Sequence, residues 1–237
     1  MYSFDSTVRY SETDEKGRLS MTALIDYLQD CSTFQCESLG IGMEHLKKEK
    51  IGWYLAAWKI EIPDLPVMND KITVSTWAYD FRGIYGSRNF TIRDPDGKYY
   101  VKADSLWFLF DLEKGVPVRA PGGETEPLLE PDRARLDMLP MERKIVPEGE
   151  GRKTTPVRVM KHHLDTNHHV NNAQYVDMAR EAIAEDFKIS ELDVQYKKAA
   201  VLDDLICPSV HRAENGFTVD LADEQGNSYA VVRIVRL

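Results

Sequence analysis

The chain has 237 residues, of which 43% are hydrophobic and 29% are charged, and its net charge is −9. This is enough for one large domain or two of about a hundred residues each, and the acidic balance argues against a protein that binds nucleic acid through its phosphates. No apolar run approaches the roughly eighteen residues of a membrane span; we expect no secretory signal, and three cysteines without a CxxC pair favour a cytoplasmic location.

The first half predicts one long helix followed by strands. Apolar residues recur at helical spacing from Met21 to Cys31, with Ser20 as the expected N-cap and Gly40 as the expected stop. Strand-forming runs follow at 72–78, 87–93 and 100–110. Because a turn signal at 94–97 separates the last two runs, we expect antiparallel hairpins after the helix.

A linker and a second helix open the second half. Residues 112–156 are rich in proline, glycine and glutamate, which is typical of a connecting segment. Beyond it comes a narrower helical stripe, with a cap expected at Asn171 or Asn172. The stripe consists of Val176, Ala179, Ile183 and Phe187. Further strands are expected at 217–221 and 229–235.

The chain repeats itself once. The matching pairs are Asp14 with Asp165, Asp70 with Asp204, and Gly97 with Gly226, at offsets of 151, 134 and 129 positions. Ordered landmarks with shrinking offsets indicate a duplication with shortened loops. A long helix wrapped by an antiparallel sheet is the hot-dog arrangement, so we expect an α+β fold of two tandem hot-dog domains, packed as a pseudo-dimer. The expected domains are 1–118 and 156–237, joined by a linker over 119–155.

The densest polar motif, over 161–172, lies where a strand should lead into the second helix, and it holds four of the six histidines. Asp165, Asn167 and His169 alternate there, so a carboxylate, an amide and an imidazole would reach one substrate if the segment is extended. Unpaired N–H groups at the helix start would form an oxyanion site. The equivalent stretch of the first half, 14–18, offers neither imidazole nor amide, so we expect chemistry in the second copy.

Other interpretations of these residues stay open. Asp165 and the asparagines that follow it also suit helix capping. A histidine cluster can bind metal, but the chain has neither an HExxH motif nor a cysteine beside the cluster. No GxSxG motif for a serine hydrolase occurs, and Cys207 is typical of a buried inert thiol. We expect neither a metal nor a cofactor.

The segment LDTNHHVNNAQY, over 164–175, resembles the signature of the acyl-ACP thioesterases of plants and bacteria. The resemblance covers nearly the whole chain, from the first helix to the VQYKK stretch at 194–198. It implies a double hot-dog fold and hydrolysis of fatty acyl thioesters on acyl carrier protein, with Asp165, Asn167 and His169 as catalytic residues. The family usually places a glutamate where this chain has Ala199.

The resemblance also implies where the substrate binds. The first copy would shape the acyl pocket and the second helix start would contact the substrate. The expected substrate-binding residues are Trp53, Trp58, Trp77, Asn171 and Asn172. The implied partner is acidic acyl carrier protein with its phosphopantetheine-linked acyl chain. Local basic clusters such as 197–198 are either ordinary solvated faces or a docking surface for an acidic partner, and charge alone does not decide between them. We expect a monomer or a homodimer; the alternatives are an acyl-CoA thioesterase and a catalytically weak acyl-binding protein.

Overall fold

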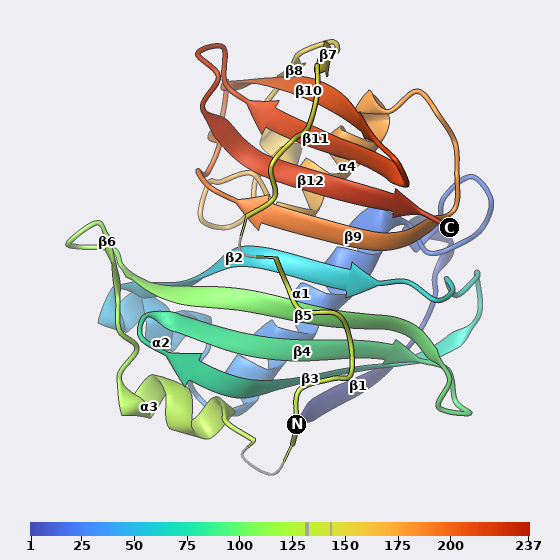
Figure 1. Cartoon of the computed structure of the whole chain (residues 1–237). Coiled ribbons are helices and arrows are strands. Elements are labelled where there is room, and N and C mark those ends of the chain that lie inside the picture. Colours follow the sequence, from blue (N-terminus) through green and yellow to red (C-terminus); the bar gives the residue numbers. More distant parts are fainter. Residues whose placement is uncertain (131–132, 143) are drawn as a thin grey trace. The chain divides into compact units, whose positions relative to one another are not determined.

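The chain forms two compact units, each with its own set of antiparallel strands (Figure 1). The computed structural model describes residues 1–130, 133–142 and 144–237. One unit consists of Met1–Ser20 and Asp26–Leu139, and the other of Met21–Ile25 and Pro140–Leu237. The first residues of the long N-terminal helix are therefore grouped with the second unit.

The sheet of the first unit is antiparallel throughout, in the order β1-β3-β4-β5-β2. Its strands are β1 (Tyr2–Thr7), β2 (Ile51–Glu61), β3 (Lys71–Arg82), β4 (Tyr85–Arg93) and β5 (Tyr99–Asp111), with the short β6 (Val116–Val118) on β5. The strands predicted at 72–78, 87–93 and 100–110 lie within β3, β4 and β5 and are confirmed. A 3-10 helix, Tyr10–Glu12, follows β1, and α2 (Met43–Glu49) precedes β2.

Helix α1 (Met21–Ser38) is the long helix that the apolar spacing predicted. The fully buried residues on its apolar side are Leu24, Ile25, Leu28 and Cys31. At its end, the Ile41 N–H donates to Cys36 O and the Gly40 N–H to Glu37 O, both at 3.1 Å. This hydrogen-bond pair needs a left-handed residue, and Gly40 supplies it with φ 74°. The predicted stop at Gly40 is confirmed.

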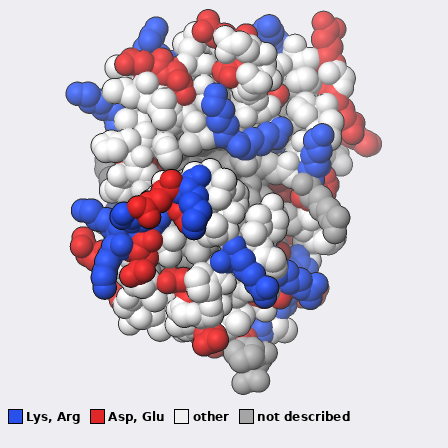
Figure 2. Space-filling model, turned by 90° about the vertical axis from the view of Figure 1, so that its left-hand side faces the viewer, with Lys and Arg blue, Asp and Glu red and all other residues white. Residues whose placement is uncertain are grey.

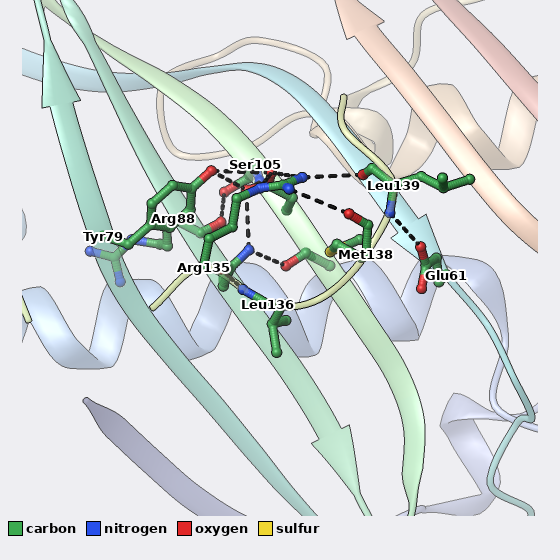
Figure 3. Close-up of polar contacts among 11 residues, drawn as sticks. Glu61, Tyr79, Arg88, Ser105, Arg135, Leu136, Met138 and Leu139 are labelled. Atoms are coloured by element: carbon green, nitrogen blue, oxygen red, sulfur yellow. Dashed lines mark hydrogen bonds and ion pairs between the residues drawn. The ribbon is translucent and has the colours of Figure 1, made fainter. Parts of the chain in front are cut away.

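The segment that follows the first sheet packs back onto it. It contains α3 (Gly122–Thr125) and a 3-10 helix, Glu126–Leu128. Residues 133–139, here called the strap, then cross β4 and β5 (Figure 3). The Leu136 N–H donates to Asn89 Oδ1 at 2.8 Å, and Arg135 Nε donates to Asp104 Oδ2 at 3.1 Å. Because Asn89 and Asp104 are buried, the strap supplies hydrogen bonds that water cannot.

The sheet of the second unit has the order β9-β12-β11-β10-β7 and is also antiparallel. Its strands are β7 (Arg152–Lys153), β9 (Ile189–Tyr196), β10 (Leu205–Ala213), β11 (Gly216–Ala222) and β12 (Ser228–Arg236), and β8 (Val157–Arg158) also pairs with β10. The strands predicted at 217–221 and 229–235 are confirmed within β11 and β12. A 3-10 helix, Lys161–His163, leads toward α4 (Asn172–Ala182), which contacts β10, β11 and β12.

Helix α4 is shorter than the apolar stripe predicted. The helix ends at Ala182, and Ile183 already has an extended backbone. The guanidinium of Arg180 donates to Glu185 O at 3.1 Å and thereby replaces the next helical turn. Phe187 lies outside the helix and stacks on Phe217 of β11, with ring centroids 5.6 Å apart.

The internal repeat is present in the hydrogen bonds of the two copies. Tyr100 donates its hydroxyl to Asp70 Oδ2 at 3.2 Å in the first copy, and Tyr229 donates to Asp204 Oδ2 at 3.1 Å in the second. The first of these tyrosines lies on β5 and the second on β12, each next to a turn closed by a left-handed glycine. Bonds that recur in this way in both copies belong to the fold.

Candidate active site

The three predicted catalytic residues are carried by one tight turn over residues 165–169. The Asp165 N–H donates to His169 O at 2.8 Å, and Asp165 Oδ1 accepts the N–H groups of Asn167 at 2.8 Å and His169 at 3.1 Å. His168 takes the left-handed conformation that closes the turn, with φ 60°. Asp165 and His169 are half-buried, and Asn167 is exposed. The segment is therefore a turn and does not meet the condition of an extended backbone, because the aspartate side chain folds the backbone around itself.

The first copy contains the same turn with different side chains, over residues 14–18. Asp14 Oδ1 accepts the N–H groups of Lys16 and Arg18, each at 2.9 Å, and Gly17 occupies the left-handed position. The two copies differ in the hydrogen bonds of the second carboxylate oxygen, Oδ2. Asp14 Oδ2 is held by the Arg18 guanidinium, with Nη2 at 3.0 Å, whereas Asp165 Oδ2 accepts no hydrogen bond from any residue that the structure describes.

The start of α4 is capped by Asn171. Its Oδ1 accepts the Ala173 N–H at 2.9 Å and its carbonyl oxygen accepts the Gln174 N–H at 2.9 Å, so the predicted cap is confirmed. These two amides are thus occupied, and the expected oxyanion site cannot be built from them while the cap is in place. The carbonyl oxygen of Asn172 accepts the hydroxyl of Tyr196 at 3.0 Å.

His163 belongs to the framework that leads into the turn. Its Nδ1 accepts the Met160 N–H at 3.0 Å, as Glu12 Oε2 accepts the Arg9 N–H in the first copy. Burial, and then the charge of the adjacent His162, lowers the pKa of His163 below its usual 6.5. A neutral His163 keeps Nδ1 as a hydrogen-bond acceptor.

The segment after β9 runs beside the turn. The Val170 N–H donates to Ala200 O at 2.9 Å, which places Ala200 beside the residue that follows His169. Ala199, the position where the resemblance places a glutamate, is exposed, and Ala200 is buried. Tyr175, the last residue of the 164–175 motif, has no role predicted from the sequence, and its hydroxyl accepts the Ala200 N–H at 2.8 Å.

Two of the three predicted pocket tryptophans face α1. Arg88 donates from Nη1 to Gln35 Oε1 of α1 at 2.5 Å, so its side of the sheet is the helix side. The strand pairing puts Trp58 on that side through Ser105, and Trp53 through Leu109. The Nε1 atoms of Trp53 and Trp58 are buried, and neither has a hydrogen-bond partner among the described residues.

Trp77 faces the other way. It pairs with Asn89, the neighbour of Arg88, and successive strand residues point to opposite faces. Its Nε1 donates to Ala134 O of the strap at 3.3 Å, and the Arg133 guanidinium lies 5.2 Å from its ring centre. Trp77 therefore lies on the face of the sheet away from α1, where the strap covers it.

Two family models match the two halves of the chain. Residues 1–124 match the acyl-ACP thioesterase N-terminal domain, and residues 148–235 match the C-terminal domain. A search of curated proteins finds no match to the sequence. Within the described residues, no helix is long and apolar enough to cross a membrane.

Solved structures share the fold at low sequence identity. A structure assigned as an oleoyl thioesterase from Lactobacillus plantarum is similar with a TM-score of 0.88 and 22% identity, covering 100% of this chain and 96% of that one. An acyl-ACP thioesterase from Bacteroides thetaiotaomicron gives 0.86 and 21%, covering 98% and 96%. The 12:0-ACP thioesterase from Umbellularia californica gives 0.85 and 19%, covering 99% and 96%. The expected hot-dog fold is confirmed, and the chain belongs to the acyl-ACP thioesterase family, whose members hydrolyse fatty acyl thioesters on acyl carrier protein.

Proposed function

We propose that the 165–169 turn is the site at which this chain hydrolyses fatty acyl-ACP, releasing the free fatty acid and ending chain elongation. The observation that carries this proposal is the second oxygen of Asp165. In the first copy the equivalent oxygen is neutralised by Arg18, whereas Asp165 Oδ2 has no partner among the described residues. A carboxylate oriented by two backbone amides and open on its other oxygen is suited to accept a proton from water.

The proposed reaction uses one water molecule. Asp165, directly or through His169, takes a proton from that water, and the water oxygen bonds to the thioester carbonyl carbon. Asn167 holds the water by its exposed amide. The carbon–sulfur bond then breaks, and the thiolate leaves and takes up the proton. Because a thiolate is a good leaving group, the reaction tolerates an alanine at 199, where the family usually has a glutamate.

The two copies divide the work in this proposal. Residues 156–237 supply the chemistry, and Asn171 and Asn172 contact the substrate at the start of α4. Residues 1–118 shape the acyl pocket, joined to the rest by the 119–155 linker. The helix-facing positions of Trp53 and Trp58, with indole N–H groups that lack partners among the described residues, support a ligand space beside α1. Trp77 has no part in it.

Acyl carrier protein is the carrier we propose, in the cytoplasm. Three unpaired cysteines in the described chain are compatible with a reducing compartment. Lys161 and Lys197 are exposed and form no ion pair with any described residue, which suits an acidic partner near the turn. Basic and acidic side chains are interspersed on the face drawn in Figure 2, so charge by itself does not select the carrier. Equal concentrations of acyl-ACP and acyl-CoA in competition decide between the two.

The test of the site is a matched pair of substitutions. Asp165→Asn keeps an oxygen that can accept both backbone N–H groups but removes the charge, and Asp14→Asn makes the same change in the first copy. We expect Asp165→Asn to lower kcat for acyl-ACP hydrolysis at least a hundredfold, with its melting temperature retained, and Asp14→Asn to keep kcat within twofold. An active Asp165→Asn variant would refute the proposal.

A further inference from the structure

Two tyrosines in the second unit, the buried Tyr175 and the half-buried Tyr196, hold the backbone around the turn. The Tyr175 hydroxyl accepts the Ala200 N–H at 2.8 Å, and the Tyr196 hydroxyl donates to Asn172 O at 3.0 Å. Their rings meet edge to face, with centroids 5.8 Å apart. Tyr175 is only 2% exposed, so its hydroxyl oxygen cannot exchange this bond for one to bulk water. The pair therefore ties α4 to the end of β9.

One peptide group connects Tyr175 to the turn. The N–H of Ala200 is held by the phenol, and the carbonyl oxygen of Ala200 accepts the Val170 N–H at 2.9 Å. Val170 directly follows His169 and pairs with Leu164, so it closes the 165–169 turn. A shift of Ala200 therefore moves Val170, and Val170 fixes the end of the turn at which His169 lies.

The first copy is an internal control for these bonds. The first copy has the same backbone hydrogen bond after its turn: the Leu19 N–H donates to Pro66 O at 2.8 Å, as the Val170 N–H does to Ala200 O. Pro66, at the position of Ala200, has no N–H to donate. The positions of the two tyrosines are occupied by Leu24 and Ile62. The phenol contacts thus occur only in the copy that carries Asn167 and His169.

We propose that Tyr175 is a positioning residue for thioester hydrolysis, which fixes the Ala200 peptide group and through it the 165–169 turn. The inference rests on the proposed function of that turn. Burial raises the pKa of Tyr175 to about 12, so the phenol stays neutral through the working range and keeps accepting the Ala200 N–H. A proline at position 200 would serve the fold equally well, as Pro66 does in the first copy; the amide and its phenol serve the site.

The test compares Tyr175→Phe with Tyr100→Phe, which removes a phenol bond that both copies share. We expect Tyr175→Phe to lower kcat for acyl-ACP about tenfold, to leave KM within twofold, and to lower the melting temperature no more than Tyr100→Phe does. Tyr100→Phe should keep kcat within twofold. Equal losses of kcat in both variants, or an unchanged kcat in Tyr175→Phe, would overturn the inference.

A second measurement does not depend on turnover. Hydrogen exchange of the Ala200 and His169 amides, followed by NMR, should accelerate in Tyr175→Phe and stay at the wild-type rate in Tyr100→Phe. Faster exchange at Ala200 without any change at His169 would show that the phenol caps one amide and does not position the turn. If the wild-type protein failed to hydrolyse acyl-ACP, the proposed function would fail, and the exchange data would still decide the role of Tyr175.

Discussion

Removing Arg135 tests how firmly the strap holds the first unit. Asp104 is 3% exposed and accepts hydrogen bonds from Arg135 Nε at 3.1 Å and the Tyr79 hydroxyl at 3.0 Å. Breaking a buried ion pair costs about 3–5 kcal/mol because it leaves an uncompensated charge. The Arg135 side chain is 33% exposed, so solvent screening reduces the cost, and we expect Arg135→Ala to lower the free energy of unfolding by about 2 kcal/mol at pH 7.

The stability deficit of Arg135→Ala should also depend on pH. Burial raises the pKa of Asp104 above 3.8, and Arg135 opposes the rise. A raised carboxyl pKa favours the protonated folded state, so its unfavourable contribution grows as pH rises above 3.8 and through the folded-state pKa. Without Arg135 that pKa rises further. The deficit of Arg135→Ala relative to the wild type should therefore be larger at pH 7 than at pH 4.5.

Urea unfolding followed by tryptophan fluorescence measures the effect in the relevant unit, because all four tryptophans lie in the first one. The control is Lys98→Ala, which removes an exposed ion pair to Asp64 with Nζ 3.3 Å from Oδ2 and should cost about 0.5 kcal/mol or less. A deficit for Arg135→Ala that matched this control, or that was the same at both pH values, would show that the strap does not depend on the buried pair.

Three further predictions address the site and its surroundings. Trp53→Ala should shift the preferred acyl length across a panel of acyl-ACPs, whereas Trp77→Phe should leave it unchanged, since Trp77 lies on the face away from α1. The pKa of His163 is lowered in the folded state, so below pH 6.5 the unfolded chain binds its proton more readily and the folded state is destabilised. The melting temperature should therefore fall less between pH 7 and pH 5 in His163→Gln than in the wild type. Asn171→Ala should lower the free energy of unfolding by about 1 kcal/mol, measured by urea unfolding followed by circular dichroism, because it removes the helix cap. Asn171→Ser, which keeps a capping oxygen, should retain most of the wild-type stability.

Local signals in the sequence were sufficient for much of the fold. The spacing from Met21 to Cys31 and the glycine at 40 determine α1, because helix burial and helix termination depend on residues within a few positions. The duplication was also visible, since Asp70 and Asp204 each bond to backbone only a few residues away in both copies. Because each of these contacts needs an aspartate a few residues from its partner, the same residue type is found at equivalent positions of the two copies.

Contacts between distant residues explain what the sequence did not predict. The face of Trp77 depends on strand register and on the strap, more than fifty positions later, and neither leaves a local pattern. Tyr175 contacts an amide twenty-five positions away. The tight turn at 165–169 did have a usable signal: the first copy places Gly17 at the left-handed position, and an Asp-x-x-Gly sequence there is typical of a turn. His168 hides that signal in the second copy.

The equivalence of the two turns makes the first one a natural acceptor for transplanted chemistry. The 14–18 turn is folded by the side chain of Asp14, so its backbone does not depend on the identity of the side chains at 16 and 18. A doubly substituted chain with Lys16→Asn and Arg18→His would display the same carboxylate, amide and imidazole on a scaffold that already has their spacing. The duplicated turn of the first copy therefore differs from the 165–169 turn at these positions by only two substitutions.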